Sequence, residues 1–351
     1  MFPDWISLNC AGPSQTHREI ALARQEQLTK PLGALGRLEA VAVELAALQA
    51  TDAPGADRVP VLLFAGDHGI AAQGVSAYPP EVTVQMLRNF ASGGAAISVL
   101  ARALGLPLEV VDAGTLATEA IAGLIVDKPR NGTRDFSREP ALTAAEVVFA
   151  LDAGRRAIAR QTERSPQLVI LGEMGIGNTT SAAAIAAALL PCAPSEIVGS
   201  GTGLDGEGRA RKARVIADAL SLHGLTSGAP AETVLPAVGG LEIIAMVGAI
   251  IAAAQARVPV LIDGFIVTVA ALAATRLNPS CRPWLIFSHR SAERGHGMLL
   301  DALGARPLID LDLRLGEASG AATALPILRL ACALHNGMAT FAEAAVSNRD
   351  A

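Results

Sequence analysis

Short apolar runs alternate with longer alanine-rich segments over most of this chain. Six runs have the length and composition of buried strands, and they lie at residues 59–65, 108–112, 168–171, 258–262, 284–287 and 307–311. The segments between them have helical spacing and include residues 81–103, 144–160, 180–190, 206–223 and 241–255. Strands that alternate with helices are joined by right-handed crossovers, which place helices on both faces of a parallel sheet. We therefore predict an α/β fold with a mainly parallel six-stranded sheet and a ligand crevice at its carboxyl edge.

Both ends of the chain lack this alternation. Residues 4–50 contain no strand pattern, and their helical spacing is interrupted at Lys30-Pro31-Leu32-Gly33. Near the other end, residues 320–334 and 339–346 have helical patterns. We expect the two ends to pack together, so that residues 1–55 and 320–351 form a small helical domain beside a large α/β catalytic domain at residues 56–319. Residues 127–140 are the most polar interior segment, and residues 127–132 within it predict a mobile surface loop.

Composition and charge argue against several classes of protein. Of the 351 residues, 51% are hydrophobic but only 3% are aromatic, so small aliphatic side chains must fill the core. The formal net charge of −5, without basic runs interleaved with aromatic residues, gives no reason to expect a nucleic acid partner. The four cysteines are far apart and the chain starts without a signal-peptide pattern, which predicts a reduced, cytoplasmic protein. The histidines lack metal-ligand spacing, so we expect neither a metal ion nor a cofactor.

Two long stretches, residues 237–254 and 258–275, have the hydropathy of membrane spans. Each contains an acid in its interior, because Glu242 lies in the first stretch and Asp263 in the second. A charged side chain in the middle of a span is costly, so we expect no membrane association. The second stretch is better explained as a buried strand, a turn at Asp263 and a helix that begins at Phe265.

Two acids lie among glycines shortly after apolar runs. Glu173 follows the run that ends at residue 171, and Glu317 follows the run that ends at residue 311. Strand ends in an open α/β sheet form the usual ligand crevice, where glycines let backbone N–H groups approach a phosphate or a flat ring. Acids at such positions can do chemistry. His68 and His289 also follow apolar runs, and a structural role suits each of them as well as a catalytic one.

Two glycine-rich turns have features of a phosphate site. Gly175 and Gly177 precede a helix start whose backbone N–H groups can bind an anion, although the lysine of a P-loop is missing. A turn without any ligand explains this pattern about as well. The second turn, residues 199–203, is followed at helical spacing by the basic residues Arg209, Arg211, Lys212 and Arg214. For Arg209 and Arg211 we favour a solvated helix face.

Several motifs recur in the order of a known family. They lie at residues 66–69 (Gly-Asp-His-Gly), 74–79 (Gly-Val-Ser-Ala-Tyr-Pro), 172–180, 199–204, 263–266, 288–296 and 314–320. Together they closely resemble the nicotinate-nucleotide–dimethylbenzimidazole phosphoribosyltransferases, and the resemblance extends from residues 30–39 to residues 338–341. It implies a cytoplasmic homodimer whose subunits have a Rossmann-like large domain and a small helical domain built from both termini. Ala318 stands where the family more often has glycine.

The resemblance implies transfer of the phosphoribosyl group of nicotinate mononucleotide to 5,6-dimethylbenzimidazole or another flat base. The products would be nicotinate and α-ribazole 5′-phosphate, which becomes the lower nucleotide ligand of cobalamin. Glu317 would be the general base, and Glu173 would steady the cationic transition state or assist with the proton. Matching residue by residue implies a nucleotide site made of Gly175, Gly177, Ser200, Gly201, Thr202 and Lys212. It also implies a base pocket lined by Ser76, Tyr78 and Gln85.

Two other functions are compatible with the sequence. An inactive nucleotide-binding or sensor protein would share the fold and bind nicotinate mononucleotide without turnover, although the intact Glu317 argues against it. A glycosyltransferase with another acceptor would keep both acids and differ in its base pocket. A flat apolar slot discriminates weakly between flat rings, so the sequence leaves open whether the base is dimethylbenzimidazole, another benzimidazole, a purine or a phenol.

Overall fold

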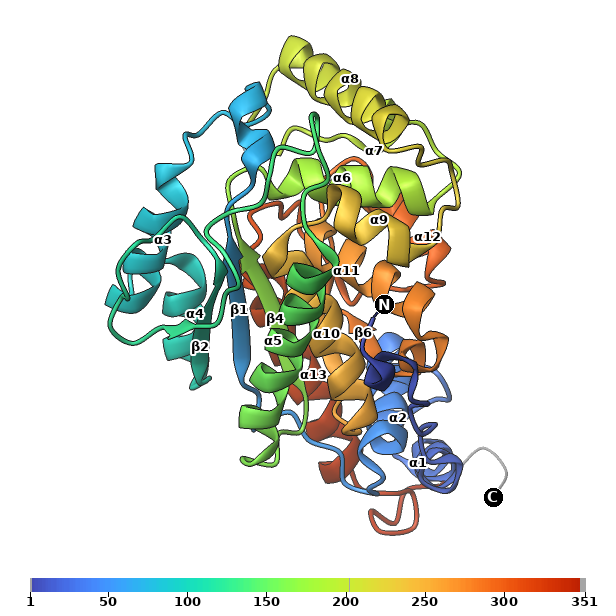
Figure 1. Ribbon diagram of the computed structural model, residues 1–351. Helices are drawn as coiled ribbons and strands as arrows, with labels where there is room; N and C mark the ends of the chain where they lie inside the picture. The colour runs from blue at the N-terminus through green and yellow to red at the C-terminus, as the bar shows by residue number, and fades with distance from the viewer. Residues whose placement is uncertain (1, 202, 348–351) are drawn as a thin grey trace.

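The computed structural model describes residues 2–201 and 203–347, and its centre is a six-stranded sheet with helices on both faces (Figure 1). The strands are β1 (Val61–Gly66), β2 (Leu108–Gly114), β3 (Ile125–Val126), β4 (Val169–Met174), β5 (Val260–Ile262) and β6 (Leu285–Phe287). All neighbouring pairs are parallel, in the order β3-β2-β1-β4-β5-β6. This is a Rossmann-like order that reverses between β1 and β4, where a crevice opens at the carboxyl edge. The predicted α/β fold is confirmed.

Five of the six predicted strands lie in this sheet, whereas residues 307–311 contain a strand that does not join it. That segment contributes β8 (Ile309–Asp310), which pairs with β7 (His289–Arg290) in a separate two-stranded sheet. The sixth strand of the main sheet is β3, which pairs with the end of β2. Its side chains are exposed, Ile125 to 37% and Val126 to 51%, so no buried apolar run marks it.

The helices follow the predicted segments closely, with a few differences. Their bounds are α1 (Gln15–Gln27), α2 (Arg37–Gln49), α3 (Glu81–Ser92), α4 (Ala96–Leu104), α5 (Ala144–Thr162), α6 (Asn178–Leu189), α7 (Pro194–Ile197), α8 (Gly206–Leu222), α9 (Ala231–Val238), α10 (Leu241–Gln255), α11 (Phe265–Leu277), α12 (His296–Ala302) and α13 (Ser319–Gly337). The predicted helix over residues 81–103 divides at Gly93, whose φ of 85° ends α3. Residues 339–346 form turns and an isolated bridge between Leu28 and Thr340 rather than the predicted helix.

Small residues allow the helices to pack tightly against one another. Figure 1 shows α5 and α10 in front of the sheet and α13 behind it. Gly154 of α5 and Gly248 of α10 lie where the two helices touch, and a Cβ atom at either position would overlap the backbone of the other helix. The core therefore depends on close backbone approach more than on large side chains. Within the described part of the chain, no helix is long and apolar enough to cross a membrane.

The end of α1 and the segment that follows α13 meet at the lower end of the molecule in the view of Figure 1, away from α6 and α8. Arg24 of α1 donates hydrogen bonds to the carbonyl oxygens of His335, Asn336 and Met338 at the end of α13. Buried residues of α2 and α13 belong to the same apolar core as the sheet. We propose that residues 1–55 and 320–351 form the small helical domain, and that its core is continuous with the core of the large domain.

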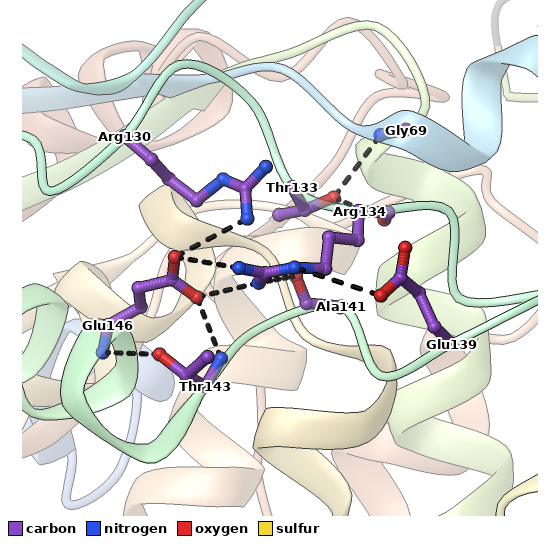
Figure 2. Close-up of polar contacts among 8 residues, drawn as sticks. All are labelled: Gly69, Arg130, Thr133, Arg134, Glu139, Ala141, Thr143 and Glu146. Atoms are coloured by element: carbon purple, nitrogen blue, oxygen red, sulfur yellow. Dashed lines mark hydrogen bonds and ion pairs between the residues drawn. The ribbon is translucent and has the colours of Figure 1, made fainter.

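An ion-pair cluster holds the polar segment at residues 127–140 (Figure 2). Arg134 Nη1 donates to the carboxylate of Glu146 at 2.7 Å, at the start of α5. Burial raises the pKa of Glu146, but hydrogen bonds from Arg134 and the helix cap lower it to about 2. On the other side of the segment, Thr133 Oγ1 accepts the N–H of Gly69 just after β1. The segment is thus anchored to α5 and to the sheet edge, and Arg130, in the predicted mobile loop at residues 127–132, also pairs with Glu146.

Candidate active site

A cavity of about 550 Å³ lies at the carboxyl edge of the sheet. Its walls come from the end of β4, the turn between β4 and α6, the turn between β5 and α11, and residues 312–317. Parallel strands end at one edge, so the fold itself brings these distant segments together. The residues that the sequence assigned to the site and that line the cavity are Tyr78, Glu173, Gly175, Gly201 and Glu317. Both predicted catalytic acids therefore face one common space.

Glu173 is the fifth residue of β4, and only 5% of it is exposed. Its carboxyl group accepts hydrogen bonds from Asn178 Nδ2, in the first turn of α6, and from the backbone N–H of Glu317. Burial raises the pKa of Glu173 to about 8, and the negative charges of Asp263, Glu242 and Glu317 add to this effect. Glu173 is therefore protonated at neutral pH and can donate a hydrogen bond as well as accept one.

Glu317 lies in the turn that precedes α13, and 6% of it is exposed. The φ angles of Gly316, Glu317 and Ala318 are 87°, 59° and 61°, so three successive residues are left-handed. Burial raises the pKa of Glu317, while hydrogen bonds from the backbone N–H groups of Ile97 and Ala96 at the start of α4 oppose the rise. Among the described residues, Glu317 Oε2 has no hydrogen-bond partner. A buried carboxylate with a raised pKa and an unused oxygen is suited to accept a proton from a ligand.

Lys212 places a buried amine beside the cavity. The residue is 1% exposed, and its Nζ donates a 2.7 Å hydrogen bond to Thr179 Oγ1 on the cavity wall. Burial lowers the pKa of Lys212 to about 8, and the charge of Glu293 opposes this effect. An anion bound here would favour the charged form of Lys212, because it would offset the cost of burying the positive charge.

The two glycine-rich turns are placed differently around this end of the cavity. Gly175 lines the cavity, and Gly177 has a φ of 96° at the start of α6 without being part of the lining. In the second turn Gly201 lines the cavity, whereas Ser200 does not. Thr202 lies outside the described residues. The structure thus brings Gly175 and Gly201 to the same cavity, while the backbone N–H groups of Asn178 and Thr180 at the start of α6 already donate to the carbonyl oxygens of Gly175 and Gly177.

The predicted base pocket is reproduced in part. Tyr78 lines the cavity with 55% of its surface exposed, and its backbone N–H donates a 3.3 Å hydrogen bond to Ser76 Oγ. Ser76 is half-buried and Gln85 is exposed on α3, and neither is part of the lining. Their role in binding the base stays a prediction. The apolar lining comes from residues that the sequence analysis did not assign, namely Met174, Ile176, Phe265, Ile266, Val267, Leu313 and Leu315.

The lining also includes polar residues that the sequence did not assign to the site, among them Asp263, His289 and Arg314. Asp263 is 1% exposed and accepts the N–H of Ala321 at 2.7 Å. Burial raises the pKa of Asp263 to about 7 and lowers the pKa of His289 to about 4, so His289 is neutral at pH 7. Arg314 Nη1 lies 3.4 Å from the carbonyl oxygen of Gly201, beside the phosphate-binding candidates. All three belong to motifs noted in the sequence, but the motifs alone do not show which of their residues reach the cavity.

His68, the other histidine that follows a strand, lies outside the lining. Its Nε2 is 2.7 Å from Glu242 Oε1, and neither side chain is exposed. Glu242 is the second residue of α10, and this pairing explains how the acid is accommodated inside an apolar helix. Of the two roles considered for these histidines, the structural role suits His68. His289 instead faces the cavity.

Known proteins share both this sequence and this fold. A family model described as a phosphoribosyltransferase matches residues 10–346. Proteins named nicotinate-nucleotide–dimethylbenzimidazole phosphoribosyltransferase from a Bradyrhizobium species and from Pseudomonas aeruginosa are 79% and 56% identical, over 100% and 99% of both chains. A crystal structure of the protein of that name from Thermus thermophilus has a TM-score of 0.90 at 45% identity, covering 95% of this chain and 99% of that one. The chain therefore belongs to the nicotinate-nucleotide–dimethylbenzimidazole phosphoribosyltransferase family.

Proposed function

We propose that this protein transfers the phosphoribosyl group of nicotinate mononucleotide to 5,6-dimethylbenzimidazole, giving nicotinate and α-ribazole 5′-phosphate. The product supplies the lower nucleotide ligand of cobalamin. The observation that carries the proposal is the cavity that holds Glu317, whose pKa is raised and whose Oε2 has no hydrogen-bond partner among the described residues. The Lys212–Thr179 pair flanks this cavity. One site thus offers a base for the acceptor and a cation for the phosphate of the donor.

Glu317 acts as the general base in this proposal. Its carboxylate removes the N–H proton of the benzimidazole while the other ring nitrogen attacks C1′ of the mononucleotide. The bond between C1′ and the nicotinate nitrogen breaks, and its electron pair stays with nicotinate, whose pyridinium ring becomes a neutral pyridine. Attack on the face opposite to the leaving group converts the β-linkage into an α-linkage. This leaving group needs no acid, so one carboxylate is sufficient for the proton.

Glu173 has the smaller role. Because its raised pKa keeps it neutral at pH 7, it is poorly suited to offset positive charge on the ribose as a carboxylate would. Its hydrogen bond with the backbone N–H of Glu317 connects it to the general base. Of its two predicted roles we therefore favour assistance with the proton over electrostatic stabilisation of the cation.

The substrates occupy the two ends of the cavity. The phosphate of the nucleotide lies near Thr179, Gly201 and Lys212, where Arg314 adds positive charge. Gly175, Gly177, Ser200 and Thr202 complete the nucleotide site. The flat base lies against Tyr78, Phe265 and Leu315, which are on the cavity wall. Ser76 and Gln85 are assigned to the base through the family resemblance.

We also infer that the enzyme is a cytoplasmic homodimer, as the family resemblance implies. The edge strand β3 supports this inference, because Ile125 and Val126 expose apolar side chains beside an unpaired strand edge. Light scattering coupled to size-exclusion chromatography should give twice the 35.9 kDa mass of the chain. A mass of one chain at micromolar concentration would contradict the dimer.

The transferase proposal is tested by incubating the protein with nicotinate mononucleotide and dimethylbenzimidazole, and separating nicotinate and α-ribazole phosphate by chromatography. Wild type should release both products in equal amounts. Glu317→Gln should lower kcat by roughly 10²- to 10⁴-fold, as expected for loss of a general base. Glu163→Gln removes an exposed carboxylate at the end of α5 and serves as the matched control with unchanged activity.

Two outcomes would overturn parts of the proposal. Binding of the mononucleotide without nicotinate release, with dimethylbenzimidazole or with any other flat base, would establish the binding-module alternative. Release of nicotinate with a purine or a phenol in preference to dimethylbenzimidazole would keep the transferase and change its acceptor. Direct competition between acceptors in one reaction distinguishes these cases, since the ratio of products reports relative kcat/KM.

A further inference from the structure

The turn that carries Glu317 has an unusual backbone. Gly316, Glu317 and Ala318 are all left-handed, with φ angles of 87°, 59° and 61°. Glycine adopts this conformation readily, but Glu317 and Ala318 have a Cβ atom that disfavours it. Strained residues of this kind persist only where the surroundings hold them in place. The groups that hold this turn therefore decide where the Glu317 carboxylate lies.

Asp263 contacts this turn from a distant part of the sequence. It follows β5 directly, and its side chain is 1% exposed. Its Oδ1 accepts the N–H of Ala321 at 2.7 Å, and the backbone N–H groups of Gly320 and Ala318 also hydrogen-bond its carboxyl group. These donors belong to the N-cap and first turn of α13, which has no side-chain cap of its own because Ala318 occupies the N-cap position. Asp263 is thus the N-terminal cap of α13, supplied through space rather than by the helix itself.

The turn is also enclosed on its other side. Gly172 of β4 packs so closely that an added Cβ atom would lie 2.6 Å from Ala318 Cβ. The ring of His289 fills the space beside Gly320, and its Nδ1 lies 3.9 Å from Asp263 Oδ1. Packing restricts movement of the turn toward β4, while the Asp263 carboxyl provides the polar attachment toward β5. Loss of that attachment would leave three backbone N–H groups of a buried helix start without their acceptor.

We propose that Asp263 is a positioning residue for the reaction, whose carboxyl group caps α13 and thereby holds the left-handed turn that presents Glu317 to the cavity. The proposal rests on the proposed function in one respect, because it takes Glu317 as the general base. It assigns Asp263 a role through the backbone of α13, although the residue also lines the cavity.

The choice of substitutions separates this role from direct contact with substrate. Asparagine is as good a helix cap as aspartate, so Asp263→Asn keeps an acceptor for the N–H groups but loses the charge. Asp263→Ala loses both. We expect Asp263→Ala to lower kcat about 100-fold, as a displaced catalytic group does, with KM for nicotinate mononucleotide changed less than about threefold. Asp263→Asn should recover most of the lost kcat. Equal losses in both variants would overturn the proposal, because they would show that the charge and not the cap is required.

Hydrogen exchange provides a readout that does not depend on activity. The backbone amides of residues 318–321 should exchange at least tenfold faster in Asp263→Ala than in wild type, and Asp263→Asn should protect them nearly as well as wild type. Thr143→Ala removes the side-chain cap of α5, far from the cavity, and should leave kcat unchanged. Unchanged protection of residues 318–321 in Asp263→Ala would overturn the proposal. If wild type lacked transferase activity but the exchange results held, the capping role would stand and the proposed function would fail.

Discussion

Glu173 and Glu317 are both nearly buried, yet their neighbours give them different properties. Other acids near Glu173 raise its pKa beyond the effect of burial, whereas backbone N–H groups at the start of α4 counteract burial at Glu317. Glu173 therefore holds a proton at neutral pH. The neighbours of Glu317 favour its ionised form more than the neighbours of Glu173 favour the ionised form of Glu173. The sequence shows both acids in similar glycine-flanked positions, so their separate roles depend on neighbours that only the fold supplies.

The protonated state of Glu173 predicts a specific dependence of stability on pH. The pKa of Glu173 is near 4.5 in the unfolded chain and about 8 in the folded protein. Between these values the folded state holds a proton that the unfolded state has lost, so the free energy of unfolding decreases as pH rises. The contribution is at most about 1.4 kcal/mol per pH unit. Glu173→Gln removes this titration and should unfold at a higher temperature than wild type, with the difference growing toward pH 8.

Thermal unfolding of wild type and Glu173→Gln across this pH range tests the expectation. Glu163→Gln changes an exposed carboxylate, and its unfolding curves should follow those of wild type at every pH. Curves for wild type and Glu173→Gln that run parallel would show that Glu173 is already ionised at low pH in the folded protein. The high pKa, and with it the favoured role in proton assistance, would then be wrong.

Lys212 allows a test of the proposed phosphate site. Its buried amine has a lowered pKa and can regain its charge when a phosphate binds. Lys212→Met keeps much of the apolar stem and should raise KM for nicotinate mononucleotide roughly 10- to 100-fold, with a smaller effect on kcat. Arg214→Met on the exposed face of the same helix is the matched control. A KM within twofold of wild type in Lys212→Met would remove Lys212 from the phosphate site.

Whether a strand could be predicted from the sequence depended on how deeply its side chains are buried. Strands such as β1 and β4 are long and wholly or almost wholly buried, so their apolar runs predict them directly. The edge strand β3 consists of two exposed residues, and its pairing with β2 leaves no pattern in the sequence. Residues 307–311 contain an apolar run but join β7 instead of the main sheet, because a run shows burial and not which strand it pairs with. The division between α3 and α4 did have a signal in Gly93 and Gly94.

The contact between α5 and α10 gives a prediction about packing. Gly154 and Gly248 allow the two backbones to touch, and there is no space for a methyl group at either position. Gly154→Ala should therefore destabilise the protein by about 2–3 kcal/mol through overpacking, although alanine is the better helix former. Gly206 of α8 has no neighbour within 4 Å of an added Cβ atom, so Gly206→Ala should be neutral or slightly stabilising. Urea unfolding measures both variants, and equal stability of the two would contradict the packing argument.

The site exists because strands that are distant in the sequence end at the same carboxyl edge of the sheet. The sequence marked Glu173, Gly175, Gly201 and Glu317 through their glycine-rich motifs, and the fold brings them to one cavity. It did not assign Asp263 to the site, because the role of Asp263 depends on α13, a helix that begins 56 residues later. Such a contact leaves no local pattern, since a cap is recognisable in sequence only when it directly precedes its helix. The reverse holds for Ser76 and Gln85, which were assigned to the base pocket by matching to the family but are not part of the cavity lining.

The continuity of the core predicts how the whole protein unfolds. Val41 and Leu45 of α2 and Leu325 of α13 belong to the same buried cluster as the strands. Helices that share a core with the sheet cannot lose their packing without exposing it, so we expect one cooperative calorimetric transition. Arg24→Ala leaves three carbonyl oxygens at the end of α13 without their donor, and should lower the temperature of that single transition by a few degrees.

Arg18→Ala on the same helix is the control, since the hydrogen bonds to α13 come from Arg24. Catalytic activity at low temperature should be unchanged in both variants, because α1 lies at the end of the molecule opposite to α6 (Figure 1). Two separate transitions, with Arg24→Ala moving only the lower one, would mean that the terminal helices unfold independently. The shared core would then contribute little to their stability, and the small domain would be a separate folding unit. A single transition that shifts as a whole would instead show that contacts between the chain ends stabilise the catalytic sheet as well.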